Sequence, residues 1–257
     1  MRKLLRDIIL NILGLLKSPK PGVHIINSHY VTPNLLDYDK DYELFENYLK
    51  YLTDIGELLS IDNAIDQVTN KKFSKNKTQF VLTFDDGFEE CYTVIAPLLE
   101  KYNCKGVFFI NTNYINSDLS YQDEFNKRIH LTTKTPMSWI QVIDLHKRGH
   151  TIGSHTLDHY NLSELSIKNI ENQIRRNKVI LEEKLNYKCD YFAWTYGRMN
   201  DFPNLALLEA EKYHKYIFSS ANYKKYFSKN NRIINRRHLE PFWPKSQINY
   251  FLSSKKQ

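Results

Sequence analysis

Short runs of apolar residues alternate with longer stretches of mixed character along most of the chain. Residues 79–84 place five β-forming residues in six positions, and Gly87 follows as a turn, which is typical of a buried strand. Repeated alternation of such runs with helical patterns predicts an α/β fold with a parallel sheet, either open or closed. Seven strands are predicted, at residues 23–30, 79–84, 105–111, 150–154, 191–196, 214–220 and 232–235.

The stretches between these strands mostly repeat their apolar residues at helical spacing. Residues 112–136 are the exception, because they lack a clean period, and a connection of that length is often a functional loop over a site. The last predicted helix opens on a capping-box pattern that begins at Asn161. Helices are predicted at residues 42–59, 89–103, 138–148 and 161–185.

Residues 1–20 form a segment apart from the single domain that we expect at residues 21–257. The segment opens with Arg2, Lys3 and Arg6 and continues with an apolar stretch that is shorter than the roughly 20 residues needed to span a bilayer. Three interpretations stay open. The segment is a helix packed on the domain, a basic amphipathic helix lying on an anionic membrane surface, or a secretion signal, although it has no small-x-small cleavage site.

The net charge and the cysteine content indicate which partners and which cellular compartment to expect. The net charge of +7 favours an anionic partner such as anionic lipid or an acidic glycan. The chain has no arginine-rich arm, RNP-like motif or zinc finger, which argues against nucleic acid. Cys91, Cys104 and Cys189 are expected to be buried free thiols, as in a reducing compartment. We therefore expect a protein in the cytoplasm or at the inner face of the membrane, with export on an uncleaved anchor as the alternative.

Polar residues with metal-ligand chemistry follow two of the predicted strands. Asp85 and Asp86 come directly after the strand at residues 79–84, and His155 and His159 follow another short apolar run. Adjacent carboxylates repel each other unless their roles differ, and a bound cation can take one as a ligand and leave the other as a base. One Asp with two His is a ligand set of catalytic zinc sites. In α/β barrels the carboxyl ends of the strands hold the active site.

This combination resembles the polysaccharide deacetylase family, the NodB-homology or carbohydrate esterase family 4 group, over roughly residues 23–240. The family motif T-F-D-D-G is present from Thr83 onward, and the motif H-[ST]-x-x-H begins at His155. The resemblance implies a distorted (β/α)7 barrel. It also implies that Asp85 is the general base and that a divalent metal, zinc before other transition ions, is held by Asp86, His155 and His159.

The third family motif, R-x-P-[YF]-G, is altered in this chain. Residues 192–197 read Phe-Ala-Trp-Thr-Tyr-Gly, which most resembles the poly-N-acetylglucosamine deacetylase branch with its F-A-Y-P-Y-G. The backbone N–H of Tyr196 would still be an oxyanion donor, because that role does not depend on the side chain. Arg236 or Arg237 is a candidate for the charge of the missing arginine, and a solvated basic pair is the alternative. The family's D-x-x-D-W motif has no match.

Two histidines are candidates for the general acid. Most of the family has this residue in an L-x-H motif near the C-terminus, and His238 is the nearest match, although the leucine is absent. The branch suggested by Phe192 and Ala193 instead resembles proteins whose acid follows the first strand in a Tyr-His-x-Val context. His29 follows the first predicted strand in this chain, but the neighbouring tyrosine, Tyr30, comes after the histidine and not before it. We predict His29 as the acid, with His238 or a structural role for His29 as the alternatives.

The resemblance implies an enzyme that removes the N-acetyl group from an acetamido sugar of a cell-surface glycan, or of its lipid-linked precursor, and releases acetate. The alternative within the same fold is an O-acetyl esterase. An alternative of another class is a catalytically inactive glycan-binding barrel, which would bind sugar without releasing acetate. Intact Asp85, Asp86, His155 and His159 argue against that last alternative.

Overall fold

Seven parallel strands form the centre of the computed structural model, which describes residues 2–74, 76–131 and 134–254. All seven strands predicted from the sequence are confirmed, and each pairs in parallel with the next along the sheet. In sheet order they are β1 (Gly22–Ser28), β3 (Thr78–Phe84), β4 (Val107–Ile110), β5 (Thr151–Ser154), β6 (Tyr191–Ala193), β7 (Tyr216–Ser219) and β9 (Ile233–Asn235).

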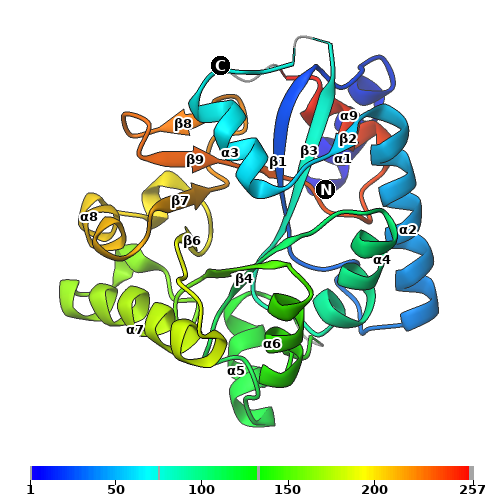
Figure 1. Ribbon diagram of the computed structural model, residues 1–257. Coiled ribbons are helices and arrows are strands. Elements are labelled where there is room, and N and C mark those ends of the chain that lie inside the picture. Colours follow the sequence, from blue (N-terminus) through cyan, green and yellow to red (C-terminus); the bar gives the residue numbers. More distant parts are fainter. Residues whose placement is uncertain (1, 75, 132–133, 255–257) are drawn as a thin grey trace.

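The two ends of this sheet are joined by one stretch of chain. β9 pairs with β7, and β10 (Arg237–His238), which follows after Arg236 alone, pairs in parallel with β1. The sheet therefore curls into a distorted barrel of seven principal strands with helices around it (Figure 1), and the predicted fold class is confirmed. Two short strands lie at its margin, where β2 (Glu57–Leu58) pairs with β3 and β8 (Phe227–Ser228) lies antiparallel to β9.

Helices cover the outside of the barrel, and capping residues explain where they depart from the sequence prediction. The Asp37 side chain accepts the N–H of Lys40 and starts α2 (Tyr38–Ile55) before residue 42. Asn161 caps only a short 3-10 turn, and Ser166 caps the long helix α7 (Ile167–Leu185) that follows it. The other helices of the wall are α3 (Ile61–Thr69), α4 (Ala96–Lys101), α6 (Trp139–Lys147) and α8 (Asn204–Tyr213).

One expectation about these connections was wrong, and one helix differs from its prediction in type. Residues 112–136 are not a plain loop, because they contain α5 (Leu119–Arg128), which Asp118 caps. This helix buries only Phe125 and Asn126, so its sequence carries almost no apolar period. The helix predicted at residues 89–103 is present, but it begins as a π-helical turn, Cys91–Ile95, and continues as α4. The three cysteines are buried free thiols, as expected.

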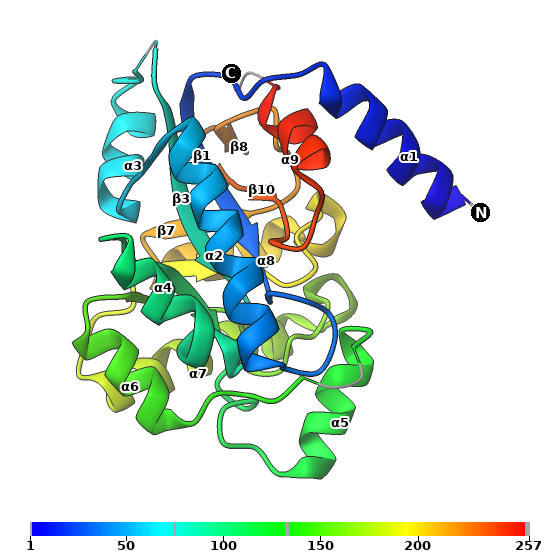
Figure 2. The same ribbon diagram turned by 90° about the vertical axis from the view of Figure 1, so that its right-hand side faces the viewer.

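The segment at residues 1–20 contains α1 (Arg2–Leu15), which lies beside α9 (Lys245–Leu252) at the edge of the molecule (Figure 2). This placement agrees with the interpretation of a helix packed on the domain. Within the part of the chain that the structure describes, no helix is long and apolar enough to cross a membrane. The side chains of Arg2 and Lys3, on which the sequence prediction partly relied, lie outside the described ones.

Candidate active site

Asp85 and Asp86 leave the end of β3 in a sharp turn. Asp86 and Gly87 both have left-handed backbone angles, with φ of 76° and 89°. At Gly87 a Cβ atom would also approach the Ile115 and Ile110 side chains to 3.1 and 3.2 Å, so a glycine is favoured there. The Asp85 N–H donates to the carbonyl of Ser28 at 3.0 Å, which ties the turn to β1. Both carboxylates are buried at the carboxyl end of the barrel.

His155 and His159 follow β5 and face the same point. The Nδ1 atom of His155 donates to the carbonyl oxygen of Ala193 at 2.7 Å, which places the lone pair of the neutral ring at Nε2. The backbone N–H of His159 donates to the Thr156 hydroxyl at 3.2 Å, and both residues have left-handed φ angles. Burial lowers the pKa of His159 to about 4, so its ring is neutral near pH 7 and is able to ligate a cation.

The spacing of these groups fits a tetrahedral metal ion. Oδ1 of Asp86 lies 3.5 Å from Nε2 of His155 and 3.3 Å from Nε2 of His159. Ligands about 2.1 Å from a tetrahedral zinc ion lie about 3.4 Å apart. Among the described residues, Oδ1 of Asp86 has no hydrogen-bond partner although it is buried. Burial alone would raise the pKa of Asp86, but the two histidines hold it well below its usual range. The three residues thus form a candidate metal site.

Arg236 holds the other carboxylate. Its guanidinium donates to both oxygens of Asp85, at 2.7 and 2.8 Å, and to the Thr83 hydroxyl at 3.0 Å. Burial alone would raise the pKa of Asp85, but Arg236 and His155 together lower it, so Asp85 is ionised. Arg237 points to the opposite side of the strand and donates to backbone carbonyls of residues 251 and 254. A solvated basic pair is therefore wrong, because both arginines are fully buried.

The two candidate acids share a buried carboxylate that the sequence analysis missed. Nδ1 of His29 lies 2.6 Å from Oε1 of Glu240, and Nε2 of His238 lies 2.8 Å from the same oxygen. Burial would lower the pKa of His29, but Glu240, together with Asp86 and Asp85, outweighs burial and raises the pKa to about 9. The contacts of 2.6 and 2.8 Å are hydrogen-bond distances, shorter than the spacing of metal ligands. No motif marks Glu240, since its role depends on where β1 and β10 meet.

A cavity of about 260 Å³ brings all these groups together at the carboxyl end of the barrel. Tyr196 lies at its wall, with a left-handed φ of 61° and its ring 5.0 Å from the ring of His159. The hydroxyl of the neighbouring Thr195, where the family has proline, donates to the carbonyl of Tyr160 at 2.7 Å and so holds this loop to the one that carries His159. The predicted site residues that line the cavity are His29, Asp85, Asp86, His155, His159, Tyr196, Arg236 and His238.

Comparisons with known proteins agree with this geometry. The model of the family described as polysaccharide deacetylase matches residues 72–214, more than half of the chain. That range contains Asp85, Asp86, His155 and His159, whereas His29 and Glu240 lie outside it.

Among curated proteins, YxkH of Bacillus subtilis (strain 168) is 26% identical over 158 residues, which cover 61% of this chain and 50% of YxkH. The peptidoglycan-N-acetylglucosamine deacetylase of Bacillus cereus is 28% identical over 125 residues, which cover 48% of this chain and 38% of that enzyme. The chain thus spans half or less of the length of these relatives.

Solved structures show the same fold. The deacetylase PplD of Streptococcus pyogenes, solved in complex with acetate, superimposes with a TM-score of 0.69 at 18% identity, covering 92% of this chain and all of PplD. IcaB from Ammonifex degensii gives a TM-score of 0.68 at 20% identity, covering 91% and 99%. With a family model that matches most of the barrel and two motifs that converge on one cavity, the chain belongs to the polysaccharide deacetylase family.

Proposed function

We propose that this chain is a metal-dependent N-deacetylase that releases acetate from an acetamido sugar of a cell-surface glycan or of its precursor. One observation carries the proposal. An ionised carboxylate, Asp85, lies beside an Asp–His–His set with metal-ligand spacing, and the protonated imidazole of His29 lines the same cavity. The membership of the polysaccharide deacetylase family supports hydrolysis of an acetyl group.

Asp86, His155 and His159 would hold the metal, which we propose to be zinc. When bound, the ion would act as a Lewis acid and lower the pKa of water. A carboxylate such as Asp85, which is a weak base, could then remove a proton from that water. The bidentate contact with Arg236 keeps Asp85 ionised and fixes the direction of its lone pairs. Asp85 is therefore proposed as the general base.

His29 is proposed as the general acid. Its Nδ1 is bonded to Glu240, so the proton available for transfer is at Nε2, and a pKa of about 9 keeps the ring protonated at neutral pH. In the proposed reaction, water adds its oxygen to the acetyl carbonyl carbon and gives a proton to Asp85. The C–N bond then breaks as the nitrogen accepts the His29 proton. The Tyr196 N–H is proposed to stabilise the oxyanion, and the products are acetate and a free amino sugar.

The choice of N-acetyl over O-acetyl substrates has two supports. An amine is a poor leaving group unless it is protonated, and a histidine kept protonated by a buried glutamate meets that need. Two curated relatives are named for N-acetylated polymers, as peptidoglycan-N-acetylglucosamine deacetylase and chitin deacetylase. To test the choice, acetate release is measured on N-acetylglucosamine oligomers and on O-acetylated oligosaccharides. Faster release from the N-acetylated set is expected, and the reverse order would identify an esterase.

Replacing one proposed ligand should weaken metal binding sharply. His155→Ala is expected to lower zinc affinity at least ~10-fold, because one of three protein ligands is lost. The measurement is a competition titration with a chromogenic chelator. His150→Ala is the matched control, since this histidine is also buried but bonds to Gly106 and Glu100 away from the cavity. Unchanged zinc affinity in His155→Ala would refute the ligand set.

The shared carboxylate predicts a pH effect. A group with a raised pKa stays protonated up to that pKa, so turnover by the wild-type protein should fall only as pH rises through about 9. In Glu240→Gln the attraction of Glu240 is lost, while burial and the attraction of Asp86 and Asp85 remain, so the pKa of His29 should fall toward its ordinary 6.5. The alkaline limb of the kcat/KM profile should then move down by about 2 pH units.

The control for this shift is His238→Gln, which keeps the bond between His29 and Glu240. It should leave the alkaline limb where the wild-type protein has it. If His238→Gln instead abolishes turnover and Glu240→Gln leaves the limb in place, His238 is the acid and the assignment of His29 is wrong.

A further inference from the structure

Helix α1 packs on the domain through its polar side. The Ser246 hydroxyl donates to Oδ1 of Asn11 at 2.8 Å, and the Gln247 amide lies 3.5 Å from the carbonyl of Asp7. Gly14 lies against α9 so closely that a Cβ atom there would come within 1.7 Å of the Ser246 carbonyl oxygen. Asp7, Asn11 and Gly14 are spaced four and three residues apart, so they share one face of the helix.

The opposite face of α1 is apolar and exposed. Of the 17 large hydrophobic side chains exposed among the described residues, seven lie at residues 5–16. Ordinary surface helices turn their apolar side to the core, and exposed apolar residues elsewhere on proteins are scattered singly. A contiguous stripe of this kind marks an interaction surface. The outward stripe, as we call it, consists of Leu5, Ile8, Ile9, Ile12, Leu13 and Leu16, which are 42 to 90% exposed.

Positive charge accompanies the outward stripe. Arg6, Lys17 and Lys20 are exposed in α1 and in the residues directly after it. Arg6 pairs with Asp7 on the side that faces α9, and Lys17 lies over the ring of Tyr250 in α9. The whole chain carries a net charge of +7. An exposed apolar helix face with exposed basic residues in and after the same helix, on a positively charged chain, matches an anionic lipid surface, where the apolar side chains enter the interface and the basic ones meet the headgroups.

A second copy of the chain fits the outward stripe less well. A helix of 14 residues is about 21 Å long, so one face about 10 Å wide offers on the order of 200 Å². Stable protein interfaces bury about 800 Å² on each partner. Pairing two such helices would also bring basic residues of two positively charged chains together.

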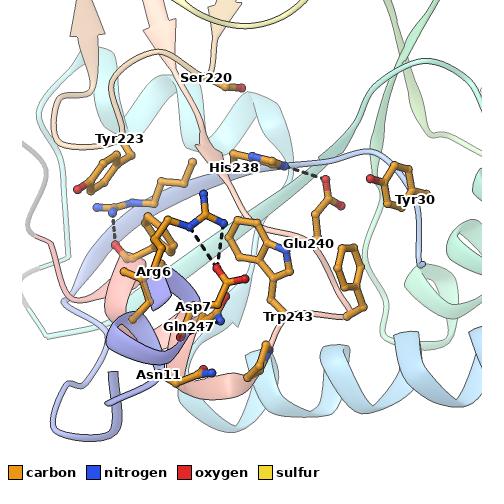
Figure 3. A pocket seen from close by; sticks show the side chains of 15 residues that line it. Arg6, Asp7, Asn11, Tyr30, Ser220, Tyr223, His238, Glu240, Trp243 and Gln247 are labelled. Carbon is orange, nitrogen blue, oxygen red and sulfur yellow. Dashed lines mark hydrogen bonds and ion pairs between the residues drawn. The ribbon is translucent and has the colours of Figure 1, made fainter. Parts of the chain in front are cut away.

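The catalytic cavity lies on the same side of the molecule as α1. A cavity of about 740 Å³ runs between α1, α9 and the barrel rim, and it is lined at one end by Arg6 and Asn11 (Figure 3). At its other end it shares Tyr30, His238 and Glu240 with the catalytic cavity. The cavity on the inner side of α1 is thus adjacent to the catalytic cavity, which His29 lines.

We propose that the outward stripe binds an anionic membrane surface and thereby presents the catalytic cavity to glycan carried on that surface. The binding half is independent of the reaction, while the glycan half rests on the proposed deacetylase function. Failure of one is therefore distinguishable from failure of the other.

The test compares two double variants of the full chain. Ile9→Gln with Ile12→Gln removes the middle of the outward stripe, where the side chains are 46 and 58% exposed. Leu205→Gln with Leu208→Gln is the matched control on α8, where the side chains are 51 and 52% exposed. Glutamine keeps helix propensity. Because all four side chains already contact solvent, thermal unfolding should be the same in both variants and in the wild-type protein.

Binding is measured by co-sedimentation with vesicles of phosphatidylglycerol and phosphatidylcholine. The wild-type protein and the α8 control should pellet alike, and the α1 variant should partition at least ~10-fold less. Vesicles of phosphatidylcholine alone should bind less of the wild-type protein. Equal partition of the three proteins would overturn the proposal. A wild-type dimer that becomes a monomer in the α1 variant, seen by light scattering without vesicles, would instead assign the stripe to a second copy and also overturn it.

A separate measurement tests whether α1 presents the catalytic cavity to glycan on the membrane. Acetate release is measured on an N-acetylglucosamine-bearing lipid in the same anionic vesicles and on soluble N-acetylglucosamine oligomers. The α1 variant should lose rate at least ~10-fold on the vesicle substrate and keep its rate on the oligomers. Equal loss on both substrates, or on neither, would refute presentation by α1. Absence of release from both substrates by the wild-type protein would count against the proposed function and leave the binding result standing.

Discussion

Asp85→Asn should lower kcat by about 10²–10⁴-fold while the protein still binds a divalent ion, because the proposed general base is lost and the proposed ligands are kept. The amide of this variant can no longer take a proton from water, whereas Asp86, His155 and His159 are untouched. The measurement is acetate release together with metal analysis of the same preparation. Near-normal turnover with bound metal would mean that the roles of Asp85 and Asp86 are exchanged or that both are misassigned.

This variant needs a stability control, because it leaves the buried charge of Arg236 without its carboxylate. Breaking a buried ion pair from one side costs about 3–5 kcal/mol, whereas replacing both partners by neutral groups often costs little. Asp85→Asn combined with Arg236→Met should therefore restore much of the lost free energy of unfolding and none of the turnover. If the double variant regained activity, Asp85→Asn alone would have failed through misfolding and not through loss of a base.

Lys134→Met should lower the free energy of unfolding by about 3–5 kcal/mol, because it leaves the buried carboxylate of Glu90 without its cation. Nζ of Lys134 lies 2.6 and 2.8 Å from the two oxygens of Glu90, which also accepts the N–H of Val31 at 3.0 Å. Both side chains are buried, and burial already raises the pKa of Glu90 to about 7. Urea denaturation at about pH 8, where Glu90 is ionised in the wild-type protein, measures the effect.

An exposed ion pair provides the control for this prediction. Lys77 contacts Glu57 on the surface, so Lys77→Met should cost less than about 1 kcal/mol. Glu90→Gln combined with Lys134→Met should recover most of the loss, since no buried charge remains. If Lys134→Met lowers the free energy of unfolding no more than Lys77→Met does, the buried ion pair does not stabilise the fold.

The sequence predicted the residues of the candidate metal site because local rules place them. Residues 79–84 read as a buried strand from their β-formers alone, and the carboxyl ends of parallel strands meet at one rim. The side chains of Asp86, His155 and His159 therefore had to lie close together, and their distances fit one ion. The family motifs added the proposed roles to that placement.

Other parts of the site depend on pairings that no local pattern contains. Arg236 faces Asp85 and Arg237 faces away because the strand divides between two neighbours at this point, and side chains alternate along it. The position of Glu240 between two histidines follows from the pairing of β1 with β10. Helix α5 was missed for a different reason, since it is polar and buries only two of its ten residues.

The most direct test of metal-dependent deacetylation measures acetate and metal on one preparation of the wild-type protein with N-acetylglucosamine oligomers as substrate. About one zinc ion per chain is expected, in agreement with one Asp–His–His site. Dialysis against a chelator should abolish acetate release, and added zinc should restore it together with an equal yield of free amino groups. Acetate release that survives complete removal of the metal, or oligomer binding by the fully loaded protein without any release, would contradict the account.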